Sequence, residues 1–201
     1  MNPFERIATF FRVVGEMLSP STASFIAIFR LEGAFEMALT VAALAGLSEA
    51  VGESVVLFVN RVRFRRFVFS LLISAVIFVF TYLFFALSIN FVARYAFDSD
   101  VELRAVAIVV GLSYAPRLFG FLAFLPYFGV PVSGLLNLWT VLVMMSSVAW
   151  ALALSPAQAL ASILLGGLLL FTLQRSVGRP VMALTRWVMR RVAGVPLVTD
   201  S

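Results

Sequence analysis

The stretch FVFSLLISAVIFVFTYLFFALSINFV, Phe67–Val92, decides the fold because it contains no charged side chain. A helix needs about 20 apolar residues to cross a bilayer core. Three later stretches have a similar composition and are long enough, or nearly so: Ala105–Phe128, Val132–Leu154 and Ala157–Leu173. A more ambiguous stretch with acidic residues, Ala34–Val59, precedes them. The sequence therefore predicts an all-α polytopic membrane helix bundle with about five transmembrane helices.

The composition supports a membrane protein and removes many kinds of chemistry. Hydrophobic residues make up 62% of the chain and charged residues 12%, whereas a soluble domain has about 25% charged residues. The chain has no cysteine and no histidine, which excludes disulfides, thiolate nucleophiles, zinc fingers and histidine acid–base catalysis. All 15 basic residues are arginine, so lysine Schiff bases are excluded too. We therefore expect no enzymatic activity and no catalytic, cofactor-binding or metal-binding residues.

Residues 1–32 form the predicted N-terminal membrane-surface segment. Within residues 2–18, apolar side chains recur at helical spacing: Phe4, Ile7, Phe11, Val14 and Leu18. Pro3 suits the first turn of this helix, and Pro20 ends it. The helix either lies on the membrane as an anchor or partner-binding element, or packs under the bundle. Met1–Arg12 contains no continuous apolar region, so we expect no signal peptide.

Residues 175–201 form the predicted basic amphipathic tail. Within it, Arg179–Val192 is expected to be a second amphipathic helix, with four arginines on or beside its polar face: Arg179, Arg186, Arg190 and Arg191. A second basic cluster follows the first apolar stretch: Arg61, Arg63, Arg65 and Arg66. We predict that both clusters contact anionic lipid headgroups. The net charge of +5 therefore indicates a lipid surface rather than a nucleic-acid partner.

Residues 33–174 form the predicted bundle, and its first helix carries a stripe of small residues. The stripe recurs at every fourth position: Ala34, Ala38, Ala42, Gly46 and Ala50. In lipid, small side chains let helix backbones approach closely, and this packing drives helix association. We therefore predict that the stripe is a helix-packing surface.

Polar residues also interrupt the apolar stretches: Glu49, Glu53, Arg117 and Asn137. A charge at bilayer depth is costly unless it is paired or neutralised. Glu49 and Glu53 either mark the polar end of a tilted span, paired with the arginines of residues 61–66, or belong to an ion or proton pathway. Arg117 follows Pro116, which breaks helices. It either snorkels to the interface or binds an anion or a carboxylate partner.

Capping patterns predict where two of the spans begin. Ser99 and Glu102 have the spacing of a capping box that opens the third span. Ser155, followed by Pro156 and Gln158, predicts a capped start of the fifth span.

Several short patterns resemble the Yip1 domain family. These are a charged loop followed by VVGLSYAP at Val109–Pro116, a span through Trp139, and LSPAQAL at Leu154–Leu160. Upstream, MLSP at Met17–Pro20 is similar to bacterial members. The resemblance covers most of the chain and implies five membrane helices and no active site. For eukaryotic relatives it implies roles in membrane traffic through partners such as small GTPases, which bacterial relatives lack.

The arginines predict an orientation in the membrane. With five spans, one side collects Arg6, Arg12, Arg30, Arg94 and Arg104. The other collects Arg61, Arg63, Arg65, Arg66, Arg175, Arg179, Arg186, Arg190 and Arg191. The positive-inside rule places the second side, with the C-terminus, in the cytoplasm of a bacterial plasma (inner) membrane. The N-terminus is then outside, whereas the eukaryotic family has it inside. A first stretch that does not cross would remove this conflict.

Two functions are compatible with these features. The first is a non-enzymatic scaffold or accessory subunit that packs against another membrane protein, indicated by the small-residue stripe and the two amphipathic helices. The second is a small transporter or channel that uses Glu49, Glu53, Arg117 and Asn137.

Overall fold

The computed structural model describes residues 3–53, 64–125 and 127–193, and within them the protein is all-helical, as predicted. The elements in chain order are α1 (Pro3–Leu18), α2 (Thr22–Phe29), α3 (Ala34–Glu53), α5 (Phe64–Phe97), α6 (Leu103–Leu112), the 3₁₀ helix η1 (Ala115–Phe124), α7 (Gly129–Ala151) and α8 (Pro156–Ala193).

Five segments of these helices are long and apolar enough to cross a membrane. They are Ala34–Gly52, Leu71–Phe97, Leu103–Phe124, Gly129–Ala151 and Pro156–Arg175. The ambiguous first stretch is thus a 20-residue helix over Ala34–Glu53, about 30 Å long at 1.5 Å per residue. These five helices fit an integral membrane protein, as the sequence predicts.

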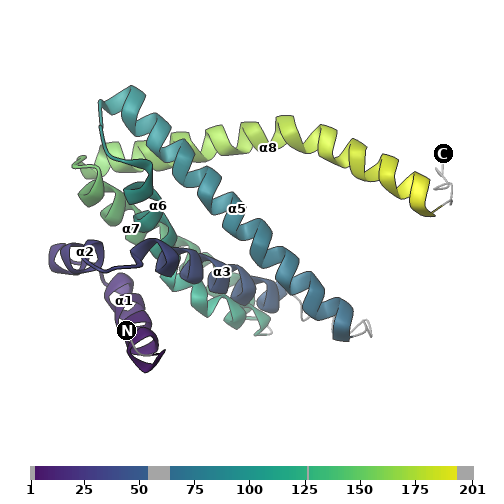
Figure 1. The fold of residues 1–201 in the computed structure, drawn as a ribbon, viewed down its shortest axis with the longest axis horizontal. Helices are drawn as coiled ribbons and strands as arrows, with labels where there is room; N and C mark the ends of the chain where they lie inside the picture. Colours follow the sequence, from purple (N-terminus) through teal and green to yellow (C-terminus); the bar gives the residue numbers. More distant parts are fainter. Residues whose placement is uncertain (1–2, 54–63, 126, 194–201) are drawn as a thin grey trace.

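The spans alternate in direction, so the bundle has two ends (Figure 1). We call the end with residues 98–102 and 152–155 end A, and the end with residues 124–129 end B. The long α5 crosses the bundle diagonally, with α3, α6, η1 and α7 on one side and α8 on the other. α3 contacts η1, α5 and α6, and α8 contacts α5 and α7.

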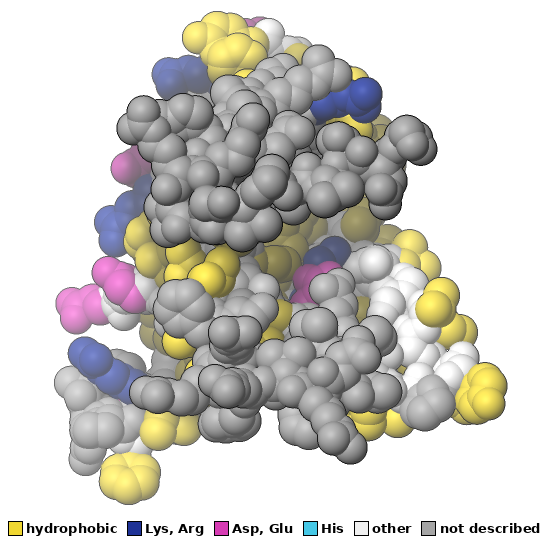
Figure 2. Space-filling model, turned by 90° about the vertical axis from the view of Figure 1, so that its right-hand side faces the viewer, with side chains coloured by type: hydrophobic (Ala, Val, Ile, Leu, Met, Phe, Trp, Pro, Cys, Tyr) yellow, Lys and Arg dark blue, Asp and Glu magenta, His cyan; other side chains and the backbone are white. Residues whose placement is uncertain are grey.

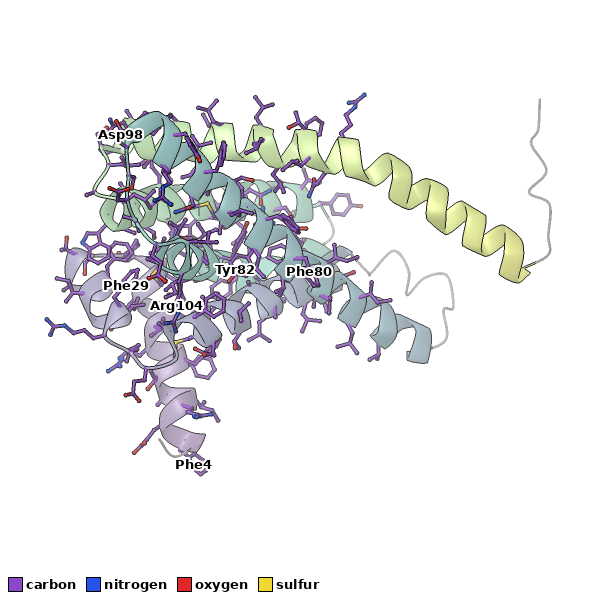
Figure 3. All side chains as sticks on the ribbon, turned by 45° about the horizontal axis from the view of Figure 1, so that its top comes forward. Phe4, Phe29, Phe80, Tyr82, Asp98 and Arg104 are labelled. Carbon is purple, nitrogen blue, oxygen red and sulfur yellow. The ribbon has the colours of Figure 1, made fainter. Side chains whose placement is uncertain are left out.

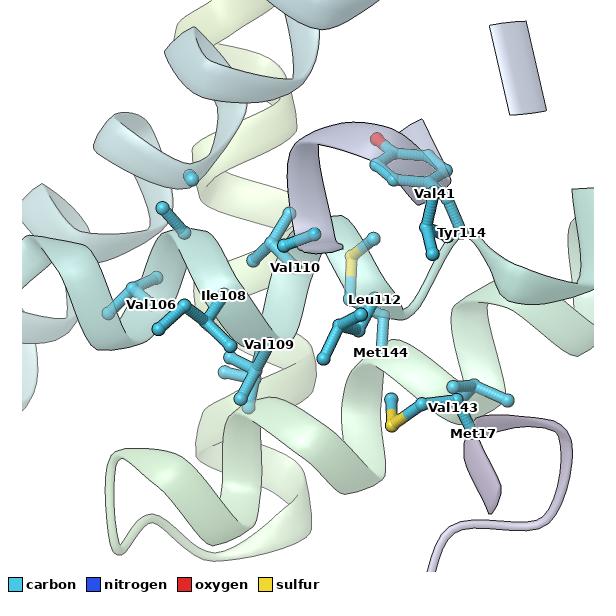
Figure 4. Close-up of a cluster of buried hydrophobic side chains, with 14 of the residues drawn as sticks. Met17, Val41, Val106, Ile108, Val109, Val110, Leu112, Tyr114, Val143 and Met144 are labelled. Carbon is cyan, nitrogen blue, oxygen red and sulfur yellow. The ribbon is translucent and has the colours of Figure 1, made fainter. Parts of the chain in front are cut away.

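α6 forms the centre of the hydrophobic core. All of its residues from Val106 to Leu112 are buried. Around it pack Val41 of α3, Val143 and Met144 of α7, and Met17 of α1 (Figure 4). The core therefore joins the N-terminal segment to the bundle through α7, because Met17 and Val143 lie on the same side of the cluster.

Small residues let α3 lie close to its neighbours. Ala38 and Ala42 are completely buried, and Ala34 is buried as well. A Cβ atom added to Gly111 of α6 would lie 3.0 Å from the Cβ of Ala38. A Cβ atom added to Gly46 would lie 2.6 Å from the Cβ of Phe78 on α5. The fifth residue of the stripe, Ala50, is partly buried.

α1 is the amphipathic helix that its spacing predicts, and it packs only partly against the bundle. Val13, Val14 and Met17 near its end are buried, and the indole N–H of Trp139 donates a hydrogen bond to the Leu18 carbonyl oxygen (3.0 Å). The apolar residues of its first turns are exposed: Phe4, Ile7 and Phe11. The last turns of α1 therefore belong to the core, and its first turns keep a free apolar face.

The third span is broken, as expected of a helix interrupted by proline. α6 ends at Leu112, and η1 begins with Pro116 in its first turn. Proline disfavours helical backbone at the residue before it and cannot donate to the preceding turn. The Ser113 hydroxyl donates back to the Val109 carbonyl oxygen at 2.6 Å, which completes the end of α6. η1 is ten residues long. This is unusual for a 3₁₀ helix, because the poor alignment of its hydrogen bonds normally limits such helices to about three or four residues.

The two predicted capping patterns have opposite outcomes. At α8, the Ser155 Oγ accepts from the Gln158 N–H (3.3 Å), and the Gln158 Oε1 accepts from the Ser155 N–H (3.0 Å), so the capped start is confirmed. At α6, the expected capping box is wrong. Glu102 is itself the N-cap and its side chain makes no capping hydrogen bond, while the Ser99 hydroxyl is buried without a partner.

α8 also differs from the expectation of a separate tail helix. It continues unbroken from Pro156 to Ala193 and includes Arg179–Val192. The helix therefore continues where the composition changes from apolar to basic, because its backbone hydrogen bonds are local. The side chains of Arg179, Arg186, Arg190 and Arg191 lie outside the described residues, so their predicted contact with lipid headgroups stays a prediction.

Candidate functional site

The candidate site is a polar cluster that joins three membrane-spanning segments. We define the polar cluster as Glu49 of α3, Arg117 of η1 and Asn137 of α7. The Arg117 Nη1 donates to both carboxylate oxygens of Glu49, at 3.0 Å to Oε1 and 2.8 Å to Oε2. The Arg117 Nη2 donates to the Asn137 Oδ1 at 2.7 Å. A guanidinium group can hold both partners because its donors point in fixed, different directions.

The cluster forms because α3 and η1 approach each other at the level of their backbones. A Cβ atom added to Gly120 would lie 3.2 Å from the Glu49 Cα, and one added to Gly52 would lie 2.5 Å from the Gly120 carbonyl oxygen. No larger residue fits this contact without a shift of the backbone. The close approach places the Glu49 carboxylate within reach of the Arg117 side chain on the neighbouring helix.

Ser48 completes the contact between α3 and η1. Its hydroxyl donates to the Leu118 carbonyl oxygen at 2.8 Å and accepts from the Phe121 backbone N–H at 2.9 Å. Backbone groups in lipid need a partner inside the protein. A single hydroxyl of α3 therefore satisfies two backbone groups of η1 next to the ion pair.

The ion pair is partly accessible. The side chains of Arg117 and Glu49 are 25% and 37% exposed. Tyr114 covers one side, with its ring centroid 5.7 Å from the guanidinium carbon of Arg117, a cation–π distance. The Arg117 Nε is buried and has no hydrogen-bond partner among the described residues. In Figure 2, which faces end B, an acidic and a basic side chain lie recessed beside each other.

The depth of the cluster follows from the helix rise. Asn137 lies about 12 Å along α7 from Gly129 at 1.5 Å per residue. Arg117 lies about 14 Å along η1 from Phe124 at 2.0 Å per residue. Both distances fall within half of a bilayer core about 30 Å thick. The cluster therefore lies in the end-B half of the apolar segments, with Glu49 three residues before the end of the Ala34–Gly52 segment.

The structure adds a partner for Glu49. Glu49 pairs with Arg117 across 68 residues of chain, and it lies in the last turn of the Ala34–Gly52 segment. Arg117 accordingly binds a carboxylate partner. The side chains of Glu53, Arg61, Arg63, Arg65 and Arg66 lie outside the described residues, so their predicted roles stay predictions.

Sequence reasoning missed three contributors to the site: Ser48, Tyr114 and Gly120. Each is an ordinary small or aromatic residue in an apolar stretch, and only the contact between α3 and η1 gives it a role. The spacing of Arg117 after Pro116 was the available signal, because a break in a helix frees backbone groups that a neighbour has to satisfy.

The side chains of the polar cluster can bind a partner group and hold the helices together. Among the residues that the structure describes, no group of three or more acidic side chains could hold a metal ion. The carboxylate of Glu49 is neutralised by Arg117, and the Ser48 hydroxyl is engaged by the backbone. The arrangement thus ties three spans together by charge-assisted hydrogen bonds.

No protein-family model, no curated protein and no solved structure matches the chain. The resemblance to the Yip1 domain family therefore stays a prediction.

Proposed function

We propose that this protein is a non-enzymatic integral membrane protein that acts as a scaffold or accessory subunit and packs against another membrane protein. One observation carries the proposal. The part of α8 that follows Arg175 extends away from the other drawn helices in both Figure 1 and Figure 3. A long helix that leaves its own bundle offers its surface to another chain or to lipid.

The interior of the bundle supports the same function. The charges of Arg117 and Glu49 are paired with each other, and α6 is buried from Val106 to Leu112. Packing is tightest at glycines, including Gly46 against Phe78 and Gly166 against Ile89. Tight internal packing gives a rigid body that presents fixed outer surfaces.

The proposal includes a location and an orientation. We place the protein in the bacterial plasma (inner) membrane, with end B and the C-terminus in the cytoplasm and the arginines of the tail on anionic lipid. A reporter fused after Ser201 tests the orientation. Activity restricted to the cytoplasm supports it, and activity only outside the cytoplasm contradicts it and favours the opposite arrangement.

Photo-crosslinking in cells tests the partner. A crosslinking residue at position 181 or 184, in the part of α8 that follows Arg175, should capture one protein of defined mass. The same residue at Leu135 or Leu138, exposed on α7, is the matched control and should capture lipid. Co-purification in gentle detergent should then recover the captured protein in a fixed ratio. Equal capture from both helices, or none from α8, would contradict the proposal.

A second candidate function, a small transporter or channel, is supported by one observation. Three of the four residues that the sequence nominates for transport meet in the polar cluster, and Arg117 and Glu49 stay partly exposed there. Ion or proton flux in liposomes that contain the purified chain alone would favour transport, provided that Glu49→Gln abolishes it. Flux that equals that of empty liposomes would favour the scaffold.

A further inference from the structure

A groove with a volume of about 580 Å³ lies along α5 and reaches the start of α6 at end A. Its apolar lining comes from three helices: Phe35 of α3, Phe80, Leu83, Phe84 and Leu87 of α5, and Ala107 of α6. The residues of α5 recur at intervals of three and four, so they form one face of that helix. This face is about 10 Å long from Phe80 to Leu87 at 1.5 Å per residue.

Two opposite charges line the same groove, Glu102 and Arg104. Figure 3 labels Arg104 and Phe80, which mark its α6 and α5 walls. Neither charged side chain has an ion pair or a hydrogen bond within the part of the chain that the structure describes. Glu102 is the N-cap of α6, yet its carboxylate makes no capping hydrogen bond. Both charges are therefore available to a ligand.

The position of these charges is fixed by the backbone. The side-chain amide of Asn90 on α5 donates to the Val101 carbonyl oxygen at 3.0 Å, which holds the start of α6 beside α5. The nearby Arg94 and Asp100 lie 3.7 Å apart and pair with each other. Glu102 and Arg104 thus keep a defined place at the polar end of an apolar groove.

A groove of this kind faces lipid, and its occupant needs an apolar chain and two opposite charges. An acyl chain gains little from the groove itself, because the surrounding bilayer is equally apolar. Selectivity therefore comes from the headgroup. A guanidinium group matches a phosphate, and a carboxylate matches an ammonium group that can donate hydrogen bonds.

We propose that the groove between α3, α5 and α6 binds one zwitterionic phospholipid with a primary-amine headgroup, its phosphate on Arg104 and its ammonium on Glu102. An acyl chain then lies along Phe80, Phe84 and Leu87. A headgroup without an amine leaves the Glu102 carboxylate without a partner beside the negative phosphate, and a choline headgroup cannot donate hydrogen bonds. The site goes beyond the proposed scaffold function and does not depend on it.

Native mass spectrometry of the full chain tests the site. Dioleoyl lipids with ethanolamine, glycerol and choline headgroups are added in turn to the delipidated protein. We expect one ethanolamine lipid to bind saturably, ahead of the other two. Glu102→Gln and Arg104→Gln should each weaken it by about two- to fivefold, the range for exposed charge pairs. Arg30→Gln, which removes an exposed arginine at the end of α2 and outside the groove, is the matched control and should leave binding unchanged.

Three results would overturn the proposal. They are equal binding of the three headgroups, a preference for the glycerol lipid, and an equal loss in Arg30→Gln. A second measurement does not depend on the charge variants. Ethanolamine lipid with brominated chains should quench the fluorescence of a Phe84→Trp variant more strongly than that of a Phe121→Trp variant, whose tryptophan lies outside the groove. Equal quenching in the two variants would also overturn it.

Discussion

Replacing Gly46 with alanine adds one methyl group where α3 crosses α5. The added Cβ lies 2.6 Å from the Cβ of Phe78 and 2.8 Å from its Cγ. Since the Phe78 Cβ is fixed to the α5 backbone, rotation of the phenylalanine ring does not relieve the contact. The two helices have to separate by about 1 Å to restore an ordinary carbon–carbon distance.

The expected cost follows from this overlap. Overpacking of a well-packed interior costs about 1–3 kcal/mol. For a chain of this size, each kcal/mol lowers the melting temperature by about 2–4 °C. We therefore expect Gly46→Ala to melt about 2–12 °C below its control. A comparison with the parent protein would underestimate this loss, because alanine favours a helix over glycine by about 1 kcal/mol and offsets part of the steric cost.

Gly134→Ala is the control that removes this ambiguity. Gly134 lies inside α7, and a Cβ atom added there meets nothing within 4 Å. Both variants gain the same helix propensity, so their difference reports the steric cost alone. Unfolding is followed by tryptophan fluorescence while both proteins are heated in the same detergent.

The double variant Gly46→Ala/Phe78→Ala tests the cause. Phe78→Ala removes the ring but keeps the Cβ atom, so Gly46→Ala should remain destabilising in that background. A melting temperature of Gly46→Ala within about 1 °C of that of Gly134→Ala would refute the close contact of α3 with α5. Such a difference corresponds to less than about 0.5 kcal/mol.

Three further predictions concern the ion pair, the tail and the start of α8. Glu49→Gln should lower the free energy of unfolding by about 1–2 kcal/mol, because it weakens charge-assisted hydrogen bonds. In the same melting assay, the double variant Glu49→Gln/Arg117→Gln should lose less stability than the sum of the two single variants. Replacing the last three arginines of α8 with glutamine should loosen the tail from the surface of anionic liposomes while the spans stay inserted, seen as faster cleavage of the tail by proteinase K. The effect should shrink at high salt, since each arginine contributes about 1 kcal/mol at the membrane surface; unchanged cleavage would contradict the lipid contact. Ser155→Ala should cost about 1 kcal/mol by removing the N-cap of α8, and a melting temperature equal to that of the parent would contradict the capping geometry.

The sequence by itself determined the class of the protein and the spans. Insertion in a bilayer depends on the length and polarity of each stretch, and both are properties of a contiguous segment. The same holds for the capped start of α8, where Ser155 and Gln158 are three residues apart. The failed prediction at α6 shows the limit of local rules, because the loop before α6 is held by Asn90 from another helix.

Only the tertiary structure decided the polar cluster. Within the described residues, Glu49 pairs with Arg117, which is 68 residues away in the sequence. The choice depends on how closely α3 and η1 approach, which Gly52 and Gly120 set at backbone contact. A sequence contains each residue's charge and size but not the distance between helices. In a membrane, where an unpaired charge is costly, that distance determines which pair forms.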